Sequence, residues 1–208
     1  LIDCGEGTQK QFRHAKISPA RVTRILITHW HGDHVFGLPG FLTSIAKFAP
    51  EKKLEIYGPA GSKRYMEMLL SSYVPLNKNN VNVVEIKNDG IFFENENLII
   101  SAFKLRHTTA CLGYNLVEKD KRNIDVDYIG KFGLKQHPIL KELQEGKDIV
   151  WNGNRIKASN ATTIKKGKIV SIVLDSEAFN EIAKNVKDSD LLICEATLGQ
   201  EFEERAHE

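Results

Sequence analysis

The sequence predicts an α/β fold in which mixed β-sheets are covered by helices. Short segments rich in β-branched residues alternate with segments whose apolar residues recur at helical spacing. Several strand segments follow one another directly, which disfavours a simple doubly wound parallel sheet. No internal repeat or low-complexity tract interrupts the 208 residues, so the chain is expected to form one domain with a sizeable core.

The first half of the chain is expected to hold strands and helices in turn. Glycines and the pair Gly58-Pro59 mark segment ends because they favour turns. Strands are predicted over residues 1–3, 22–28, 53–59, 81–86 and 97–107, and helices over 9–16, 37–49 and 61–73.

The second half is expected to begin with a strand over 113–119, followed by a polar, irregular stretch over 119–148. A strongly apolar strand over 169–175, a helix over 179–188 and a last strand over 190–197 follow. Polar residues that can bind metal recur at strand ends: Asp3, His29, His107, Asp175 and Glu195. Loops converge at one edge of such a sheet while the strands stay rigid, which indicates a site there.

Composition narrows the class of protein. The formal net charge is only +2, so bulk charge does not indicate nucleic-acid binding. The chain has neither a signal-peptide pattern nor an apolar run near the roughly 18 residues that cross a bilayer, and its three separated cysteines are typical of reduced thiols. We expect a cytoplasmic protein without membrane contact. The ends, LIDCGEGTQ and EFEERAHE, lie within elements, which predicts truncation on both sides.

Residues 29–34 read His-Trp-His-Gly-Asp-His and carry the strongest chemical signal. Neutral imidazole and carboxylate are good ligands for zinc and similar ions. His29 and His31 are two residues apart and can face the same side of an extended loop. A polar loop with helix-capping residues is the alternative, but clustered buried histidines need partners. The motif therefore predicts a metal site.

Two later strand ends can complete that site. His107 follows an apolar strand, and Asp175 follows another. Taken alone, the first would be an ordinary histidine and the second a helix cap. Next to the histidine motif they become ligand candidates, because a carboxylate can bridge two cations that clamp a phosphoryl or acyl transition state.

Five stretches resemble motifs of the ribonuclease Z family in the metallo-β-lactamase superfamily. They are DCGEGTQ (3–9), THWHGDHVFGLPG (28–40), LEIYGPAG (54–61), HTTACLGYNLVE (107–118) and DLLICEAT (190–197). The resemblance extends over essentially the whole chain. It implies an αβ/βα sandwich of two mixed sheets, two Zn²⁺ ions at one edge, and cleavage of tRNA precursors at the 3′ side.

The resemblance also implies roles for individual residues. It implies His29, His31 and His107 as ligands of one zinc ion, Asp33 and His34 as ligands of the other, and Asp175 as the bridge. Asp33 would in addition be the catalytic base that orients the attacking water. Asp3 and Glu195 would steady the ligands from a second layer.

Three features depart from the family pattern. A last histidine ligand is expected beyond Glu208, and His207 is interpreted as a surface residue. Leu174-Asp175-Ser176 stands where the family has Gly-Asp-Thr. His137 precedes Pro138 in the expected tRNA-gripping arm, where the family has glycine.

The arm is expected at about 119–150. Residues 119–148 hold seven Lys or Arg and six acidic residues, a balance of +1, so charge alone predicts a solvated excursion. Lys131, Lys135 and Lys141 are the candidate phosphate contacts if they share a face. The family implies a homodimer in which the arm of one subunit binds the tRNA that the other cuts.

The expected function is a zinc-dependent endoribonuclease that removes the 3′ trailer of tRNA precursors and leaves a 3′-hydroxyl on the tRNA. One alternative is a metallo-β-lactamase-fold phosphodiesterase acting on small diesters. Another is a catalytically incomplete metal-binding or RNA-binding fragment, or a subunit completed by another chain. Deleting the arm distinguishes the tRNA-processing enzyme from the small-diester phosphodiesterase. The metal content distinguishes the incomplete fragment from both.

Overall fold

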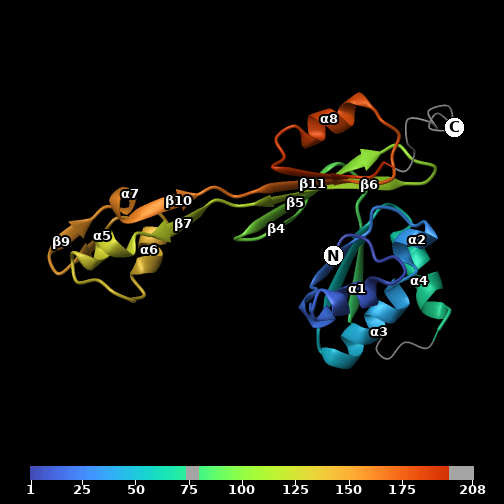
Figure 1. Ribbon diagram of the computed structural model, residues 1–208, viewed down its shortest axis with the longest axis horizontal. Helices are drawn as coiled ribbons and strands as arrows, with labels where there is room; N and C mark the ends of the chain where they lie inside the picture. Colours follow the sequence, from blue (N-terminus) through green and yellow to red (C-terminus); the bar gives the residue numbers. More distant parts are fainter. Residues whose placement is uncertain (74–79, 197–208) are drawn as a thin grey trace. The chain divides into compact units, whose positions relative to one another are not determined.

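The computed structural model describes residues 1–73 and 80–196. The chain divides into two compact units. The first comprises Leu1–Phe93, Ile100–Asn115 and the described part of Val170–Glu208, and the second comprises Glu94–Ile99 and Leu116–Ile169. Both contain helices and strands (Figure 1), and the fold is α/β with mixed sheets.

The N-terminal part of the first unit is built on three parallel strands in the order β1-β2-β3. They are β1 (Arg24–Leu26), β2 (Leu54–Gly58) and β3 (Val81–Glu85), with Ile2 bridged to Leu26. The helical elements are α1 (Thr8–His14), the 3₁₀ turn η1 (Pro19–Arg21), α2 (Gly32–Val35), α3 (Leu38–Phe48) and α4 (Ser62–Ser71). Their apolar faces meet the sheet in one core, which includes Ile25, Ile27, Phe41, Leu54 and Ile56.

The first unit also contains most of a five-stranded sheet in the order β12-β11-β6-β5-β4. The strands are β4 (Gly90–Glu94), β5 (Leu98–Leu105), β6 (Cys111–Glu118), β11 (Ile169–Val173) and β12 (Leu191–Cys194). β11 and β12 run parallel. Helix α8 (Asn180–Val186) packs Ile182 and Val186 onto buried Phe103 and Val173.

Two hydrogen bonds join β6 to the segment that follows β1. The Leu112 amide donates to the Thr28 carbonyl over 3.0 Å. The hydroxyl of the fully buried Tyr114 donates to the Ile27 carbonyl over 2.6 Å. These contacts lie next to His29, so they fix the start of the histidine loop against the second sheet of the same unit.

The second unit has a core of its own. Strands β7 (Lys121–Ile124) and β10 (Thr162–Lys165) pair antiparallel, and Ile124 faces Thr162 at the end of the ladder. Beyond this pair lie α5 (Val126–Gly130), α6 (Leu140–Gln144), the hairpin of β8 (Ile149–Trp151) and β9 (Asn154–Ile156), and α7 (Ala158–Ala161). Their buried residues are Ile129, Leu134, Leu143, Ile149, Ile156, Ala158 and Ala161.

The prediction of an irregular stretch over 119–148 was therefore wrong. Its short apolar pieces are too brief to show a period, but together they enclose a core. The ladder also continues to Lys165, beyond the expected boundary near residue 150. β4 was missed as well, and β5 ends at Leu105, so His107 lies in a bend rather than at the strand end. The strand predicted over 1–3 is reduced to a bridge between Ile2 and Leu26. β6 starts at Cys111, before the strand predicted over 113–119, and α1 starts at Thr8. The other predicted helices and strands are confirmed with shorter bounds, as far as the described residues extend.

Among the described residues, no helix is both long enough and apolar enough to span a membrane.

Candidate metal centre

The histidine loop follows directly from β1. The strand ends at Leu26, and the buried residues Ile27 and Thr28 lead into His29, which is fully buried. Helix α2 starts at Gly32, immediately after His31, and carries Asp33 in its first turn. A short strand followed by a short helix therefore turns the chain within six residues and brings the histidines together.

Residues 3–5 hold the far side of this loop. The Cys4 amide donates to the His34 carbonyl over 2.7 Å, and the Gly37 amide donates to the Cys4 carbonyl over 2.8 Å. A Cβ at Gly37 would lie 2.0 Å from the Gly5 carbonyl oxygen, so this approach requires glycine. The stretch DCGEGTQ thus supports the histidine loop through its backbone.

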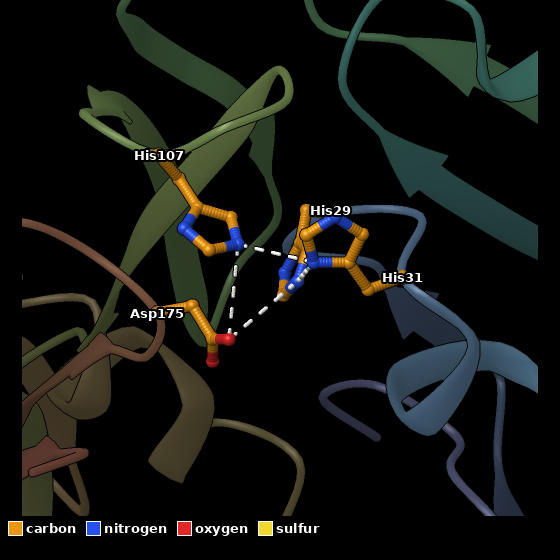
Figure 2. A group of neighbouring side chains, drawn as sticks. All are labelled: His29, His31, His107 and Asp175. Atoms are coloured by element: carbon orange, nitrogen blue, oxygen red, sulfur yellow. Dashed lines mark hydrogen bonds and ion pairs between the residues drawn. The ribbon is translucent and has the colours of Figure 1, made fainter. Parts of the chain in front are cut away.

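Three imidazole nitrogens converge at the centre of the site (Figure 2). His29 Nε2 lies 3.0 Å from His31 Nδ1, and His107 Nε2 lies 3.1 Å from the same nitrogen. Asp175 Oδ2 lies 3.8 Å from both His29 Nε2 and His107 Nε2. The four donor atoms lie within 4.8 Å of one another, and all belong to the first unit.

Asp175 connects this group to a second one. Its other oxygen, Oδ1, lies 3.3 Å from His34 Nε2, and donor atoms of His34, Asp175 and Glu195 lie within 4.8 Å of one another. One carboxylate oxygen therefore faces the three-histidine group and the other faces His34. This is the arrangement expected of a carboxylate that bridges two cations.

The side chain of Asp3 orients His34. Its Oδ2 accepts from His34 Nδ1 over 2.7 Å and from the Thr28 hydroxyl over 2.6 Å, and its Oδ1 accepts from the Thr28 amide over 2.7 Å. Because Nδ1 of His34 is used in this bond, Nε2 points at Asp175. A carboxylate that holds a ligand imidazole in this way fixes its tautomer and its orientation.

The pKa values fit ligand roles. Burial, followed by the charge of His34, lowers the pKa of His29 to about 4, so its imidazole is neutral at neutral pH. The hydrogen bond to Asp3 raises the pKa of His34. Desolvation alone would raise the pKa of Asp175, but the hydrogen bond with Glu195 and the charge of His34 lower it, so this carboxylate is ionised.

The residues present fit a bound cation. His31 Nδ1 faces two other imidazole nitrogens at once, and a single proton cannot form two good hydrogen bonds there. Asp175 Oδ1 is buried and accepts no hydrogen bond from the described residues. Imidazoles and carboxylates without any cysteine form a donor set suited to zinc, and also to manganese or iron.

The other residues singled out from the sequence lie elsewhere. The Asp33 side chain is 74 % exposed and belongs to neither donor group, although its Oδ2 lies 3.5 Å from His34 Nε2. Lys131, Lys135 and Lys141 are exposed in the second unit. His207 lies outside the described residues. Sequence reasoning missed Thr28, which is fully buried and bonded to Asp3 and His29; only its place before the motif signals it.

We expect Asp3→Asn to weaken metal binding without unfolding the protein. An amide in place of the carboxylate no longer attracts the His34 Nδ1 proton as strongly, and loss of such a support lowers metal affinity by roughly 10- to 100-fold. Competition with a chromophoric chelator measures the affinity. The control is Glu6→Gln, which changes an exposed acid of the same segment and should leave the affinity unchanged. Equal affinities in the two variants would contradict the role of Asp3.

Curated proteins named ribonuclease Z are similar to this chain over its whole length. Ribonuclease Z of Bacillus cereus is 38% identical over 218 residues, which cover 100% of this chain and 69% of the relative. Ribonuclease Z of Bacillus mycoides is 37% identical over 214 residues with the same coverage. A family profile described as Anti-Pycsar protein Apyc1 matches residues 1–128.

Solved structures agree with these relatives. The short form of human tRNase Z aligns with a TM-score of 0.69 and 26% identity, and covers 100% of this chain and 70% of that one. The metallo-β-lactamase fold protein YhfI from Bacillus subtilis aligns with a TM-score of 0.60 over 97% of this chain and 61% of that one. Its 14% identity supports the fold alone. The fold is thus metallo-β-lactamase-like, as the motifs predicted.

Proposed function

Because this chain belongs to the ribonuclease Z family, and also matches the Anti-Pycsar protein Apyc1 profile over residues 1–128, we propose that it removes the 3′ trailer of tRNA precursors. The observation that carries the proposal is the pair of donor groups joined by Asp175. The reaction is hydrolysis of one phosphodiester. Water adds to phosphorus, the bond to the 3′-oxygen breaks, and that oxygen leaves with a proton as the 3′-hydroxyl of the tRNA.

The proposed ligands of the first ion are His29, His31 and His107, those of the second are Asp33 and His34, and Asp175 bridges. Two bound cations would lower the pKa of water and neutralise charge on the phosphate. Asp33 is proposed to orient the attacking water, which its exposed position beside His34 allows. Glu195 supports the second group through its hydrogen bond with Asp175.

The ions are proposed to be zinc. Measurement of metal content in protein purified without added metal tests this, and two zinc ions per chain are expected. One tight ion or none, together with absent nuclease activity, would favour the incomplete-fragment alternative. On the strength of the family resemblance, we further propose that the protein is cytoplasmic and forms a homodimer. Light scattering during gel filtration measures the molar mass and so tests the dimer.

The second unit is proposed to bind the tRNA. Lys131, Lys135 and Lys141 are exposed there, and none of them forms an ion pair within residues 1–73 and 80–196. Several other lysines of the unit are paired, for example Lys147 with Glu145. These three ammonium groups have no acidic partner in an ion pair, although that of Lys131 lies over the Tyr128 ring. We propose that they contact phosphates, and such contacts position a folded RNA without reading its sequence.

We expect removal of the second unit's core to abolish tRNA cleavage while hydrolysis of bis(4-nitrophenyl) phosphate continues. The variant joins Ile124 to Thr162 through Asn-Gly, which fits a two-residue turn at the last pair of the β7–β10 ladder. Cleavage of a labelled tRNA precursor and release of nitrophenolate are measured side by side. Equal loss of both activities would contradict a docking role.

A matched point variant avoids the deletion. Changing Lys131, Lys135 and Lys141 to alanine should weaken precursor binding and reduce its salt dependence, because each phosphate contact adds to the salt slope. The control changes three paired lysines of the same unit, Lys121, Lys147 and Lys166, to alanine. The same loss in both variants would show that only total charge matters.

Hydrolysis of small diesters is the second candidate function. The observation that favours it is the Apyc1 profile match, which ends at residue 128 and so excludes most of the second unit. A protein that hydrolyses small diesters efficiently but cleaves no tRNA precursor would support this candidate over the first.

We expect acidification to release metal from the His34 group before the three-histidine group. A metal competes with protons for each imidazole. The pKa of His34 is raised from the ordinary 6.5 by its bond to Asp3, whereas that of His29 is lowered to about 4 by burial. Protons therefore bind His34 at a higher pH than they bind His29. Equilibrium dialysis from pH 8 to pH 5, followed by metal analysis, should show two separate losses; simultaneous loss of both ions would contradict this order.

A further inference from the structure

The histidine loop carries a tryptophan that the metal centre does not use. Trp30 lies between His29 and His31 and stacks on Tyr65 of α4, with ring centroids 5.5 Å apart and an interplanar angle of 28°. Trp30 is partly buried against the core of the first unit, whereas Tyr65 is 42% exposed. A stacked pair with one accessible partner therefore begins one residue away from two metal ligands.

A chain of hydrogen bonds holds Trp30 in place. Its Nε1 donates to the Ser62 hydroxyl over 2.7 Å, and that hydroxyl donates to the Pro59 carbonyl over 2.6 Å. Ser62 is fully buried, and a Cβ at Gly58 would lie 2.4 Å from its oxygen. The indole is thus fixed in the absence of any ligand, which reduces the entropy cost of stacking on this pair.

Tyr65 is confined in a similar way. A Cβ at Gly61 would lie 3.1 Å from Tyr65 Cε2, and Gly61 has a φ of +94° that favours glycine. Trp30 and Gly61 therefore hold the phenol ring in position while part of it stays accessible. Helix α4 packs through its buried residues Ser62 and Met66. The exposed part of the Tyr65 ring is therefore not needed for this packing.

The same helical turn is cationic. Lys63 and Arg64 are exposed, and neither forms an ion pair within the described ranges 1–73 and 80–196. The acid Glu85 accepts from the amides of Gly61 and Lys63, both over 3.1 Å, and so caps the helix start. Glu67 is an exposed acid in the next turn. Cations beside an accessible aromatic ring form the combination that binds single-stranded nucleic acid.

We propose that Trp30, Tyr65, Lys63 and Arg64 form a stacking subsite for an unpaired nucleotide of the substrate. The RNA identity of the ligand rests on the proposed function. A trailer that leaves a paired stem presents unpaired bases, and every base offers a face that can stack on Tyr65. Such a contact tolerates any sequence, as removal of varied trailers requires. The phosphates flanking the base meet Lys63 and Arg64.

The test measures binding of a short single-stranded oligoribonucleotide by fluorescence anisotropy. A chelator is present so that the oligoribonucleotide is bound but not cleaved. We expect Tyr65→Leu to weaken binding roughly 5- to 150-fold, the effect of losing one base–aromatic stack. Tyr65→Phe keeps the ring and should bind within about twofold of the unaltered protein. Phe48→Leu, which removes a 66% exposed ring on α3, should change nothing.

An oligonucleotide series completes the test. If abasic sites replace the bases, the unaltered protein should bind as weakly as Tyr65→Leu. Binding of Tyr65→Leu within twofold of the unaltered protein, or a loss upon abasic substitution that is equal in both proteins, would overturn the subsite. Lys63→Glu with Arg64→Glu should weaken binding and flatten its salt dependence, whereas the exposed pair Lys184→Glu with Lys187→Glu on and after α8 should not.

The two proposals fail separately. Ring-dependent binding by a protein that cuts no tRNA precursor would leave the subsite standing and reject the proposed function. Normal precursor cleavage by Tyr65→Leu, with unchanged KM, would reject the subsite and leave the function standing.

Discussion

Asp175→Asn should reduce cleavage of a tRNA precursor by roughly a thousandfold and lower the bound metal from two ions to one or none. Asp175 is the only residue shared by the two donor groups found among the described residues. Its Oδ2 lies 3.8 Å from His29 Nε2 and its Oδ1 lies 3.3 Å from His34 Nε2. An asparagine keeps the size but removes the charge and one acceptor oxygen, so it cannot bridge two cations equally well. Loss of one cation removes several kcal/mol of transition-state stabilisation.

Single-turnover cleavage and metal analysis on the same preparation measure both effects. Asp188→Asn is the matched control, because this exposed aspartate follows α8 at some distance along the chain from the donors. It should keep two ions and full activity. Circular dichroism must show that Asp175→Asn is folded. Retention of two ions with activity within tenfold of the unaltered protein would contradict the bridging role.

Phe41→Ala should destabilise the protein by about 3–5 kcal/mol, which is the usual cost of removing a buried phenylalanine. Phe41 is fully buried in α3, and its ring meets Phe12 of α1 edge to face with centroids 4.8 Å apart. Removal leaves a cavity between the two helices, and α3 follows directly on the helix that carries Asp33 and His34. A loss of this size approaches the total stability of many domains.

Urea unfolding followed by tryptophan fluorescence measures the change. Phe48→Ala is the matched control on the same helix, because Phe48 is 66% exposed. It should alter the free energy of unfolding by no more than about 0.5 kcal/mol. Similar values for the two variants would show that the core cluster contributes less than its burial indicates. Metal affinity measured below the unfolding midpoint separates loss of fold from loss of the site.

Five residues predicted from the sequence converge in the donor groups, because the chemistry of metal binding is local: His29, His31, His34, His107 and Asp175. Asp33 was also expected as a ligand but belongs to neither group, whereas Glu195, expected in a second layer, has a donor atom in the His34 group. His29, His31 and His34 are close in sequence, and imidazoles at that spacing serve little purpose without a cation. His107 and Asp175 could be predicted as neighbours of the histidine motif because each follows an apolar strand, and the ends of strands lie together at one edge of a sheet. The placement of Asp3 as a support for His34 agrees with the hydrogen bond between them.

The second unit shows where sequence reasoning failed. Its helices have four or five residues and its strands three or four, and segments of that length carry no readable period. Leu134 and Leu143 are isolated apolar residues in the sequence, but both are almost fully buried in one cluster. Local propensity could not reveal this core, because its stability comes from contacts between segments that are individually unstable.

The fold class, the family and most residues of the donor groups could be predicted from the sequence, because these depend on residue type, hydrophobic pattern and short spacing. Only the tertiary structure decided which oxygen of Asp175 faces which group, and that Trp30 stacks on Tyr65. Asp175 lies 146 residues after His29, and Tyr65 lies 35 residues after Trp30. The direction of each oxygen of Asp175 depends in addition on the rotation of its side chain. Such contacts arise from the packing of whole elements, which no local pattern encodes.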